Sequence, residues 1–339
     1  MRIQVNGRYL HQRVTGMQRY AREIVSRLAD AMDVIQPRQE GKGVRGHLWE
    51  QMVLPSRLNK GLLWSPSTTG PLAVKHQVVT IHDTAFVDQP QCFTRAFAAW
   101  YQYLVPRLAR RVRKIITVSN FSKERIADYC RIPLDKIVAI HSGVDPRFQP
   151  VEPSRVEETR QRLGLPAQYV LFVGNLEPRK NLLRLLQAWH TLPHQQLGLS
   201  LVLVGTKQHV FRDIGLTEPP QAVHFAGYLD DADLPTVYSG AEMFVFPSIY
   251  EGFGFPVLEA MACGVPVVCS NNTSLPEVAG TAAHFIDPYD IESIADGILR
   301  VAQDETLRAT LREAGLANAK RFTWQSTIDA TWRTFEEAA

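Results

Sequence analysis

Short apolar runs alternate with helical patterns along most of the chain. Runs of strand length, rich in β-branched and aromatic residues and bounded by Gly, Pro or Ser, predict buried strands at 78–81, 114–118, 169–173, 201–204, 243–246 and 265–268. Helical patterns between them include 20–31 and 182–190. This alternation predicts an α/β protein with parallel sheets, whose ligands bind at the carboxyl ends of the strands.

The weakest pattern lies at residues 145–153, which include Pro146, Pro150 and Pro153. Prolines at this density disfavour both a helix and a central strand, so we expect a linker there. A chain of 339 residues usually forms about two domains. We therefore predict α/β domains at 1–150 and 151–320 that face each other across a cleft. The last segment, 321–339, is expected to be a helix that packs back toward the first domain.

Charge divides the chain at the same place. The formal net charge is only +3, yet residues 1–150 hold 23 Lys and Arg against 11 Asp and Glu, a net charge of +12. Residues 151–339 hold 14 against 23, a net charge of −9. The two domains are thus expected to have different partners, and the basic one suits phosphates, anionic lipid or nucleic acid.

The composition excludes several classes of protein. A content of 45% hydrophobic and 21% charged residues is not that of a disordered chain. No apolar run approaches the 18 or so residues of a membrane span, and the first residues lack the apolar core of a signal peptide. The four cysteines form no C-x-x-C pair, which predicts reduced thiols and a cytoplasmic protein.

The segment 250–264 is the richest in candidate chemistry. Two glycines, Gly252 and Gly254, permit a tight turn after a strand, and Gly264 is a suitable residue just past the end of the helix that follows. Amide groups at the start of that helix are suited to an anion such as a diphosphate. The two carboxylates, Glu251 and Glu259, either bind a polar ligand such as a sugar or are a capping and a solvated residue.

The spacing of Glu251 and Glu259 resembles the E-x7-E motif of retaining family-4 glycosyltransferases, which have the GT-B fold. Four other segments resemble the same family in the same order, namely 117–122, 142–145, 172–181 and 272–278. The resemblance runs from about residue 14 to about residue 325. It implies two Rossmann-like, doubly wound domains, with the nucleotide sugar bound to the second domain and the acceptor to the first.

Arg179 and Lys180 follow a predicted strand at the expected start of a helix. The dipole disfavours cations there, so the pair is better explained by a bound anion than as an ordinary surface pair. In sugar transfer, negative charge grows on the departing phosphate, and fixed cations stabilise that transition state. The resemblance implies this role for both residues.

The resemblance also implies the other contacts. Donor contacts fall on Gly16, Gly174, Leu229, Phe253, Gly254, Phe255 and Glu259, with Glu251 orienting the sugar. Many members carry two or three glycines where the segment 14–20 keeps only Gly16. His82, at the end of a buried strand, is implied to lie near the transferred sugar, with Asp83 fixing the imidazole or its loop. The alternative for this pair is a structural cap at the strand end.

Two further patterns have competing interpretations. The acids at 230–233 suit a divalent metal or, more simply, a helix cap at Asp230 or Asp231, so no metal is predicted. Aromatic and aliphatic residues at helical spacing, followed by basic residues, fill 93–114. That segment, Phe93–Lys114, is either a core-packed helix with a solvated end or a helix that lies on an anionic bilayer. No nucleic-acid motif is present.

Together these features predict a retaining, metal-independent hexosyltransferase without a cofactor. The segment 48–55 resembles bacterial mannosyltransferases of surface-polysaccharide assembly, which favours GDP-mannose over a UDP-sugar and a polyprenyl-diphosphate-linked saccharide acceptor. Such an enzyme is expected in the cytoplasm, peripheral to the inner face of the membrane. The alternatives are a GT-B nucleotide-sugar epimerase and a catalytically silent partner subunit that binds a nucleotide sugar or a membrane.

Overall fold

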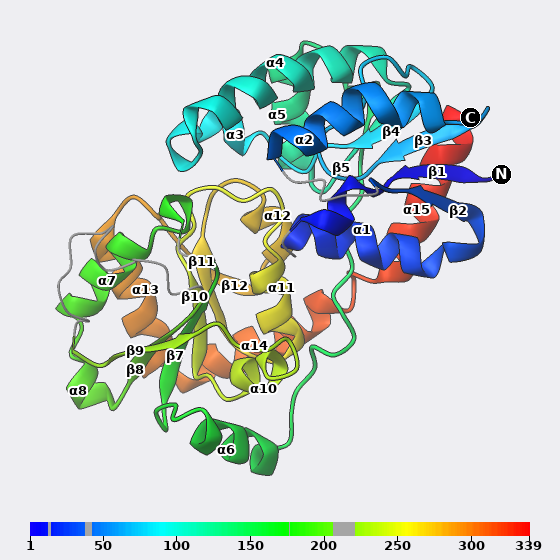
Figure 1. Cartoon of the computed structure of the whole chain (residues 1–339). Helices are drawn as coiled ribbons and strands as arrows, with labels where there is room; N and C mark the ends of the chain where they lie inside the picture. The colour runs from blue at the N-terminus through cyan, green and yellow to red at the C-terminus, as the bar shows by residue number, and fades with distance from the viewer. Residues whose placement is uncertain (13–14, 38–42, 176, 206–220) are drawn as a thin grey trace. The chain divides into compact units, whose positions relative to one another are not determined.

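The computed structural model describes residues 1–12, 15–37, 43–175, 177–205 and 221–339, and the chain forms two compact units (Figure 1). Unit 1 consists of Met1–Gly143 and Phe322–Ala339, and unit 2 of Val144–Arg321. The division precedes the proline-rich segment, which belongs to unit 2. There Phe148 is buried and packs edge-on against Tyr238, with ring centroids 5.8 Å apart.

Unit 1 is built on a parallel sheet of six strands in the order β2-β1-β3-β4-β5-β6. The strands are β1 (Ile3–Asn6), β2 (Met32–Ile35), β3 (Leu62–Ser65), β4 (Gln77–Thr80), β5 (Lys114–Thr117) and β6 (Ile137–Ala139). The order reverses between β1 and β3, which places the expected ligand edge of this sheet at their carboxyl ends.

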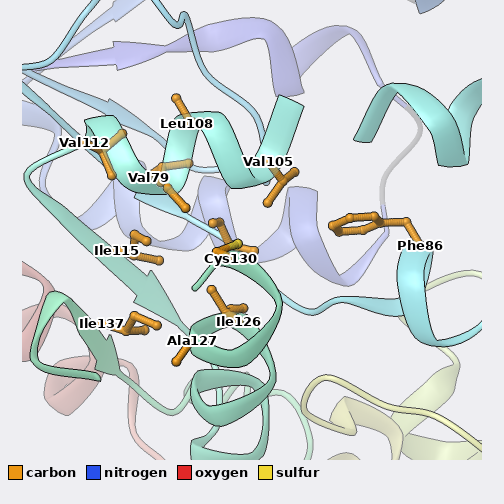
Figure 2. Packing of buried hydrophobic residues seen from close by; sticks show 12 residues of the cluster. Val79, Phe86, Val105, Leu108, Val112, Ile115, Ile126, Ala127, Cys130 and Ile137 are labelled. Carbon is orange, nitrogen blue, oxygen red and sulfur yellow. The ribbon is translucent and has the colours of Figure 1, made fainter. Parts of the chain in front are cut away.

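The helical segments of unit 1 cover this sheet. They are η1 (Gly7–His11), α1 (Gly16–Arg27), η2 (Ala29–Ala31), α2 (Gly43–Leu48), η3 (Trp49–Val53), η4 (Leu54–Arg57), α3 (Ala85–Asp88), η5 (Pro90–Cys92), α4 (Arg95–Arg111), α5 (Asn120–Cys130), η6 (Leu134–Lys136) and α15 (Trp324–Ala338). One buried cluster joins α4 and α5 to strands β4–β6, as Figure 2 shows for Leu108, Ile126 and Ile137. The returning helix α15 packs against α1, β4 and β5.

Unit 2 is built on a second parallel six-stranded sheet, in the order β12-β11-β10-β7-β8-β9. Its strands are β7 (Tyr169–Val173), β8 (Ser200–Val204), β9 (Val223–Gly227), β10 (Met243–Phe246), β11 (Val267–Ser270) and β12 (Ala283–Ile286). Counted within the unit, this is the order 6-5-4-1-2-3 of the Rossmann fold. The order reverses between β7 and β10.

The helical segments of unit 2 precede, connect and follow these strands along the chain. They are α6 (Pro153–Arg162), η7 (Pro178–Lys180), α7 (Leu182–Thr191), α8 (His194–Leu197), α10 (Leu234–Ser239), α11 (Phe255–Ala262), α12 (Leu275–Ala279), α13 (Ile291–Gln303) and α14 (Glu305–Ala319). Among the described residues of both units, no helix is long and apolar enough to cross a bilayer. The four cysteines are free, and three of them are buried.

The α/β class and the six predicted strands are confirmed, with differences at the ends of elements. The strand predicted at 265–268 is β11 at Val267–Ser270. Pro266 has no amide to donate and precedes this strand. The first helix begins at Gly16 rather than Tyr20 and ends at Arg27, followed by the single turn Ala29–Ala31. Six strands of three to five residues, β1, β2, β3, β6, β9 and β12, were not predicted, because so short a run carries little periodicity.

Candidate functional site

The switch point of unit 2 brings together the loops that follow β7 and β10. The Arg179 carbonyl oxygen accepts a hydrogen bond from the Ile249 amide at 2.8 Å and lies 3.1 Å from the Ser248 hydroxyl oxygen. In the next position, Asn181 adopts a left-handed conformation (φ 61°) and donates from Nδ2 to the Pro247 carbonyl at 3.0 Å. These bonds fix the two loops to each other, so that their side chains share one site.

Four charged side chains meet in that site. Lys180 Nζ lies 2.5 Å from Glu251 Oε1, and Arg179 Nη1 lies 3.3 Å from Glu251 Oε2. Arg179 Nε also lies 2.8 Å from Oε2 of Glu177, whose side chain is 40% exposed. The Ser248 hydroxyl donates to Glu251 Oε1 at 2.5 Å. The side chains of Lys180 and Glu251 are each 8% exposed, and that of Arg179 is 21% exposed. The sequence prediction treated the two cations and Glu251 as separate contacts, whereas the structure joins them in one cluster.

The cluster keeps Glu251 ionised. Burial alone would raise the pKa of this carboxyl, but Lys180, Arg179 and the Ser248 hydroxyl oppose it, and the net effect lowers the pKa. The Lys180 ammonium also lies 4.7 Å from the centre of the Phe246 ring, a favourable cation–π distance. Two cations are thus held at the carboxyl edge of the sheet around one buried carboxylate.

The loop after Glu251 turns sharply into α11. Gly254 has φ 105°, a backbone conformation that favours glycine, and a Cβ atom there would also lie 2.6 Å from Leu275 Cδ2. The Ser274 hydroxyl bonds the carbonyl oxygens of Glu251 and Phe253 at 3.0 and 2.9 Å. The first backbone amides of a helix have no hydrogen-bond acceptor within that helix. The turn at Gly254 places the first amides of α11 at the carboxyl edge of the unit 2 sheet.

Glu259 lies inside α11 and is 6% exposed. The Tyr238 hydroxyl donates to its Oε2 atom at 3.1 Å. The interpretation of Glu259 as a solvated helix residue is therefore wrong, because the carboxylate is buried and hydrogen-bonded. Leu229 is also buried, in the segment between β9 and α10.

Gly174 directly follows β7, and a Cβ atom on it would lie 3.8 Å from Lys180 Cδ. Phe253 is buried just before the α11 turn, and Phe255 is the first residue of that helix. Gly264 has φ 73° just past the end of α11, as predicted. Leu176, which lies in the segment 172–181, is outside the described residues.

The helix cap predicted at Asp230 or Asp231 is wrong by two or three residues. Helix α10 begins at Leu234, so Asp233 stands at its N-cap position. Asp233 instead accepts a hydrogen bond from Arg162 Nη2 at 2.6 Å, and Asp231 lies 3.7 Å from Arg147 Nη1. Residues 231–233 form a turn before α10, so the helix begins later than the sequence spacing indicated.

Two predicted residues lie in unit 1. Gly16 is the first residue of α1, where Thr15 and Gln18 form a capping box, while Val14 lies outside the described residues. His82 follows β4 and is 7% exposed, with Nε2 2.9 Å from the Pro66 carbonyl oxygen. Asp83 Oδ1 accepts from the Ala85 amide at 3.0 Å and so fixes the loop that leads into α3.

Burial lowers the pKa of His82 to about 4, although its hydrogen bond to Pro66 acts in the opposite direction. The imidazole is therefore neutral near pH 7. A carbonyl oxygen only accepts, so the proton of the neutral ring lies on Nε2. The Nδ1 lone pair is then the acceptor that this side chain offers.

The helix of the segment 93–114 is α4, and its apolar stripe packs mainly on the core. Leu104 and Leu108 are fully buried, and Phe93 and Tyr101 pack against the cluster of Figure 2. The core-packed interpretation is thus correct for most of the stripe. Large apolar area remains exposed at Phe97 (37%) and outside the stripe at Tyr103 (49%).

Sequence reasoning missed three residues of the unit 2 site. Ser248 and Asn181 organise the charged cluster, and Tyr238 bonds Glu259. Ser248 comes directly after Pro247 at a strand end, and Asn181 comes directly after Lys180. Both residues could have been identified from the sequence. Ser248 is a polar residue at a strand end, where side chains lie at the ligand edge. Asn181 is of a type that tolerates a left-handed backbone.

The chain is similar to known glycosyltransferases over most of its length. A family described as glycosyl transferases group 1 matches residues 155–317, and one described as glycosyltransferase family 4 matches residues 62–148. The O-antigen chain mannosyltransferase B of Escherichia coli is 35% identical over 274 residues, which are 78% of this chain and 71% of that protein. A serotype-specific mannosyltransferase WbdA of Escherichia coli is 32% identical over 226 residues, 64% of this chain but 28% of that longer protein.

Solved structures share the architecture at low sequence identity. Anabaena Alr3699/HepE, in complex with UDP-glucose, has a TM-score of 0.78 at 20% identity and covers 99% of this chain and 100% of its own. WaaG, a glycosyltransferase involved in lipopolysaccharide biosynthesis, has a TM-score of 0.76 at 16% identity and covers 99% of both chains. With the two parallel six-stranded sheets, these similarities confirm the predicted GT-B fold.

Proposed function

Because the chain belongs to the group 1, family 4 glycosyltransferases, we propose that it transfers a mannosyl group from GDP-mannose to a saccharide acceptor in the assembly of a bacterial surface polysaccharide. The relatives support the sugar and the process, since both Escherichia coli proteins are mannosyltransferases and one acts on the O-antigen chain. The observation that carries the chemistry is the cluster of Arg179, Lys180 and Glu251 at the switch point of unit 2.

This cluster suits a departing nucleoside diphosphate. As the bond between the sugar C1 atom and the phosphate oxygen breaks, negative charge moves onto the diphosphate, and Arg179 and Lys180 stabilise it there. Glu251, itself bonded by Ser248, holds the lysine in place before the reaction, so little reorganisation accompanies charge development. The α11 turn at Gly254 offers its amides to the same anion. Glu259, oriented by Tyr238, accepts from the ribose hydroxyls.

The proposed transfer retains the configuration at C1. The acceptor oxygen forms its bond to C1 on the face from which the phosphate leaves, and the acceptor proton passes to the leaving phosphate oxygen. No protein nucleophile, metal or cofactor takes part in this scheme. His82, neutral and buried in unit 1, is proposed to contact the sugar through Nδ1.

The acceptor is proposed to be lipid-linked, with unit 1 resting on an anionic membrane. Val44, Leu48 and Met52 recur at every fourth position of α2 and η3 and are 76%, 53% and 73% exposed. The Trp100 indole donates to His47 Nδ1 at 3.1 Å, which joins α2 to the aromatic face of α4.

The same two segments carry the charge that an anionic bilayer would attract. The residues 43–60 and 89–114 contain nine Lys and Arg and a single acid, Glu50, which is 1% exposed. We call the exposed residues of α2, η3 and α4 the α2–α4 surface. Apolar side chains among cations without an exposed carboxylate suit an anionic bilayer surface.

The donor is tested by thermal shift of the whole chain with GDP-, UDP- and dTDP-sugars. A ligand that binds only the folded state raises the Tm according to its affinity, so GDP-mannose should give the largest shift. A larger shift with a UDP- or dTDP-sugar would overturn the choice of donor. Release of GDP from GDP-mannose should require a saccharide acceptor, whereas consumption of the sugar nucleotide without acceptor would indicate an epimerase.

Binding of the α2–α4 surface to a membrane is tested by cosedimentation of the protein with phosphatidylglycerol vesicles and with phosphatidylcholine vesicles. The wild type should bind only the anionic vesicles, and replacement of Leu48 and Met52 by Glu should release it. Replacement of Tyr228 by Glu is the matched control, because Tyr228 is 68% exposed in unit 2. Undiminished binding of the double variant would reject the α2–α4 surface as the site of attachment.

A further inference from the structure

A buried ion pair occupies the switch point of unit 1. Arg8 follows β1 by two residues, and its Nε atom lies 3.2 Å from Glu50 Oε1. The two side chains are 3% and 1% exposed. The strand order reverses between β1 and β3, so this pair lies at the edge where sheets of this type bind their ligands. The transfer scheme proposed above gives it no role.

The pair binds the loop that follows β3. Arg8 Nη2 donates to the Thr69 hydroxyl at 2.6 Å, and that hydroxyl lies 3.1 Å from Glu50 Oε1. Next to Glu50, the Gln51 side chain donates to the Gly70 carbonyl at 2.9 Å. Burial alone would raise the pKa of Glu50, but Arg8, His47 and Asn6 oppose it and the net pKa is lowered, so the ion pair persists near pH 7. The loop is therefore held by fixed charges.

The same loop holds His82. Its Pro66 carbonyl oxygen is 2.9 Å from His82 Nε2, only three residues before Thr69. Between them, Thr68 adopts a left-handed conformation with φ 66°, which a β-branched residue rarely takes. Such a conformation persists only where the surroundings enforce it, and here Thr69 is bonded to the Arg8–Glu50 pair and Pro66 to His82.

We propose that the Arg8–Glu50 pair positions His82 for the substrate. By holding Thr69, the pair fixes the Pro66 carbonyl oxygen, which keeps the imidazole proton on Nε2 and leaves the Nδ1 lone pair to accept a hydrogen bond from a saccharide hydroxyl. Arg8 and Glu50 are positioning residues that act through the loop and do not contact the sugar. This inference rests on the proposed sugar transfer for its substrate, but the arrangement of the loop and His82 is testable without it.

The test removes the contact between the pair and the loop while leaving the pair intact. Thr69→Val deletes the hydroxyl at almost constant volume, and Thr69→Ser restores it. The matched control is Thr334→Val, because Thr334 is 2% exposed in the same unit and its hydroxyl donates to the Ala330 carbonyl oxygen within α15. Gln51→Met, which removes the Gln51 side-chain bonds to the Gly70 carbonyl and the Leu72 amide, is a second variant should Thr69→Val not fold.

The readout independent of activity is ¹⁵N NMR of histidine-labelled protein, with the His82 signals assigned by their loss in His82→Gln. The wild type, Thr69→Ser and Thr334→Val should show a single neutral tautomer protonated on Nε2. Thr69→Val, or Gln51→Met in its place, should show exchange between tautomers. In the transfer assay, kcat of Thr69→Val should fall about 10-fold, the usual order for a small misplacement of a contact group, with the KM for donor little changed.

An unchanged Nε2 tautomer in folded Thr69→Val would overturn the proposal, as would a Thr69→Ser variant that behaves like Thr69→Val. The proposal would also be overturned if Thr69→Val had the same kcat as the control Thr334→Val. If no sugar nucleotide is consumed by the wild type, the proposed function fails, while the NMR comparison still decides whether the pair positions His82.

Discussion

The two units place a cluster of Arg and Glu at the same topological position but in different states. In unit 2, two cations surround Glu251, and Arg179 keeps 21% of its side chain exposed. In unit 1, one cation meets one carboxylate, and Arg8 and Glu50 are both almost wholly buried. The formal charges of both arrangements balance, because Arg179 also pairs with Glu177 at 2.8 Å, but the first is partly exposed at Arg179 and at Glu177 (40%), whereas the second is inaccessible. A shared topology thus fixes where charges gather, and their exposure decides whether they can bind a ligand or only hold a loop.

The largest expected effect is on the stability of unit 1. Glu50→Gln leaves Arg8 buried without its carboxylate, which should lower the free energy of unfolding by about 3–5 kcal/mol. Urea unfolding followed by tryptophan fluorescence measures this, because five of the six tryptophans lie in unit 1. The control is Glu337→Gln, which removes a surface pair with Lys114 at 3.5 Å and should change stability by less than about 1 kcal/mol. Equal losses in both variants would contradict the comparison.

The next effect is on catalysis in unit 2. Lys180→Ala should lower the rate of transfer on the order of 100-fold, because stabilisation of the leaving diphosphate is lost. Steady-state kinetics with GDP-mannose and acceptor are compared with those of Lys320→Ala, since Lys320 is an exposed lysine of the same unit. Near wild-type turnover in Lys180→Ala would remove the main support for the proposed site.

The smallest effect concerns pH. The pKa of His82 is about 4 in the folded protein and about 6.5 when unfolded, so the unfolded chain binds a proton that the folded one does not between these values. Its stabilising contribution is complete above pH 6.5 and is lost as the pH falls toward 4. On acidification from pH 7 to 5, the wild type should lose about 2 kcal/mol more stability than His82→Gln. Parallel losses in urea unfolding at the two pH values would show that His82 is not buried as a neutral group.

The sequence predicted the parts of the fold that leave a strong periodic or chemical signal. Hydrophobic runs such as 169–173 revealed the central strands, and the glycines around Phe253 revealed the turn into α11. The loops at the unit 2 switch point could also be identified as the candidate site from the sequence, because the carboxyl ends of parallel strands lie at one edge of the sheet. The resemblance to a known family supplied the roles of Arg179, Lys180 and Glu251, which remain proposals.

Other features depend on contacts that are distant in sequence. The bond between Tyr238 and Glu259 joins two helices, and the one between His82 and Pro66 joins two loops, so no local pattern predicts either. The apolar stripe of α4 was ambiguous for a related reason. Spacing alone identifies an apolar face but not what covers it, and in the structure that face packs on α5 and the sheet.

The return of α15 to unit 1 has a consequence for the order in which the protein forms during synthesis. Phe335 is fully buried beside Trp64, and a Cβ atom on Gly143 would lie 2.2 Å from the Trp324 amide nitrogen. Unit 1 is therefore incomplete on the ribosome until residues 322–338 have been made, although its first 143 residues emerge early. Unit 2 is continuous from Val144 to Arg321 and has all of its strands before then. Unit 2 is thus synthesised after most of unit 1 but is the first of the two units that can finish folding.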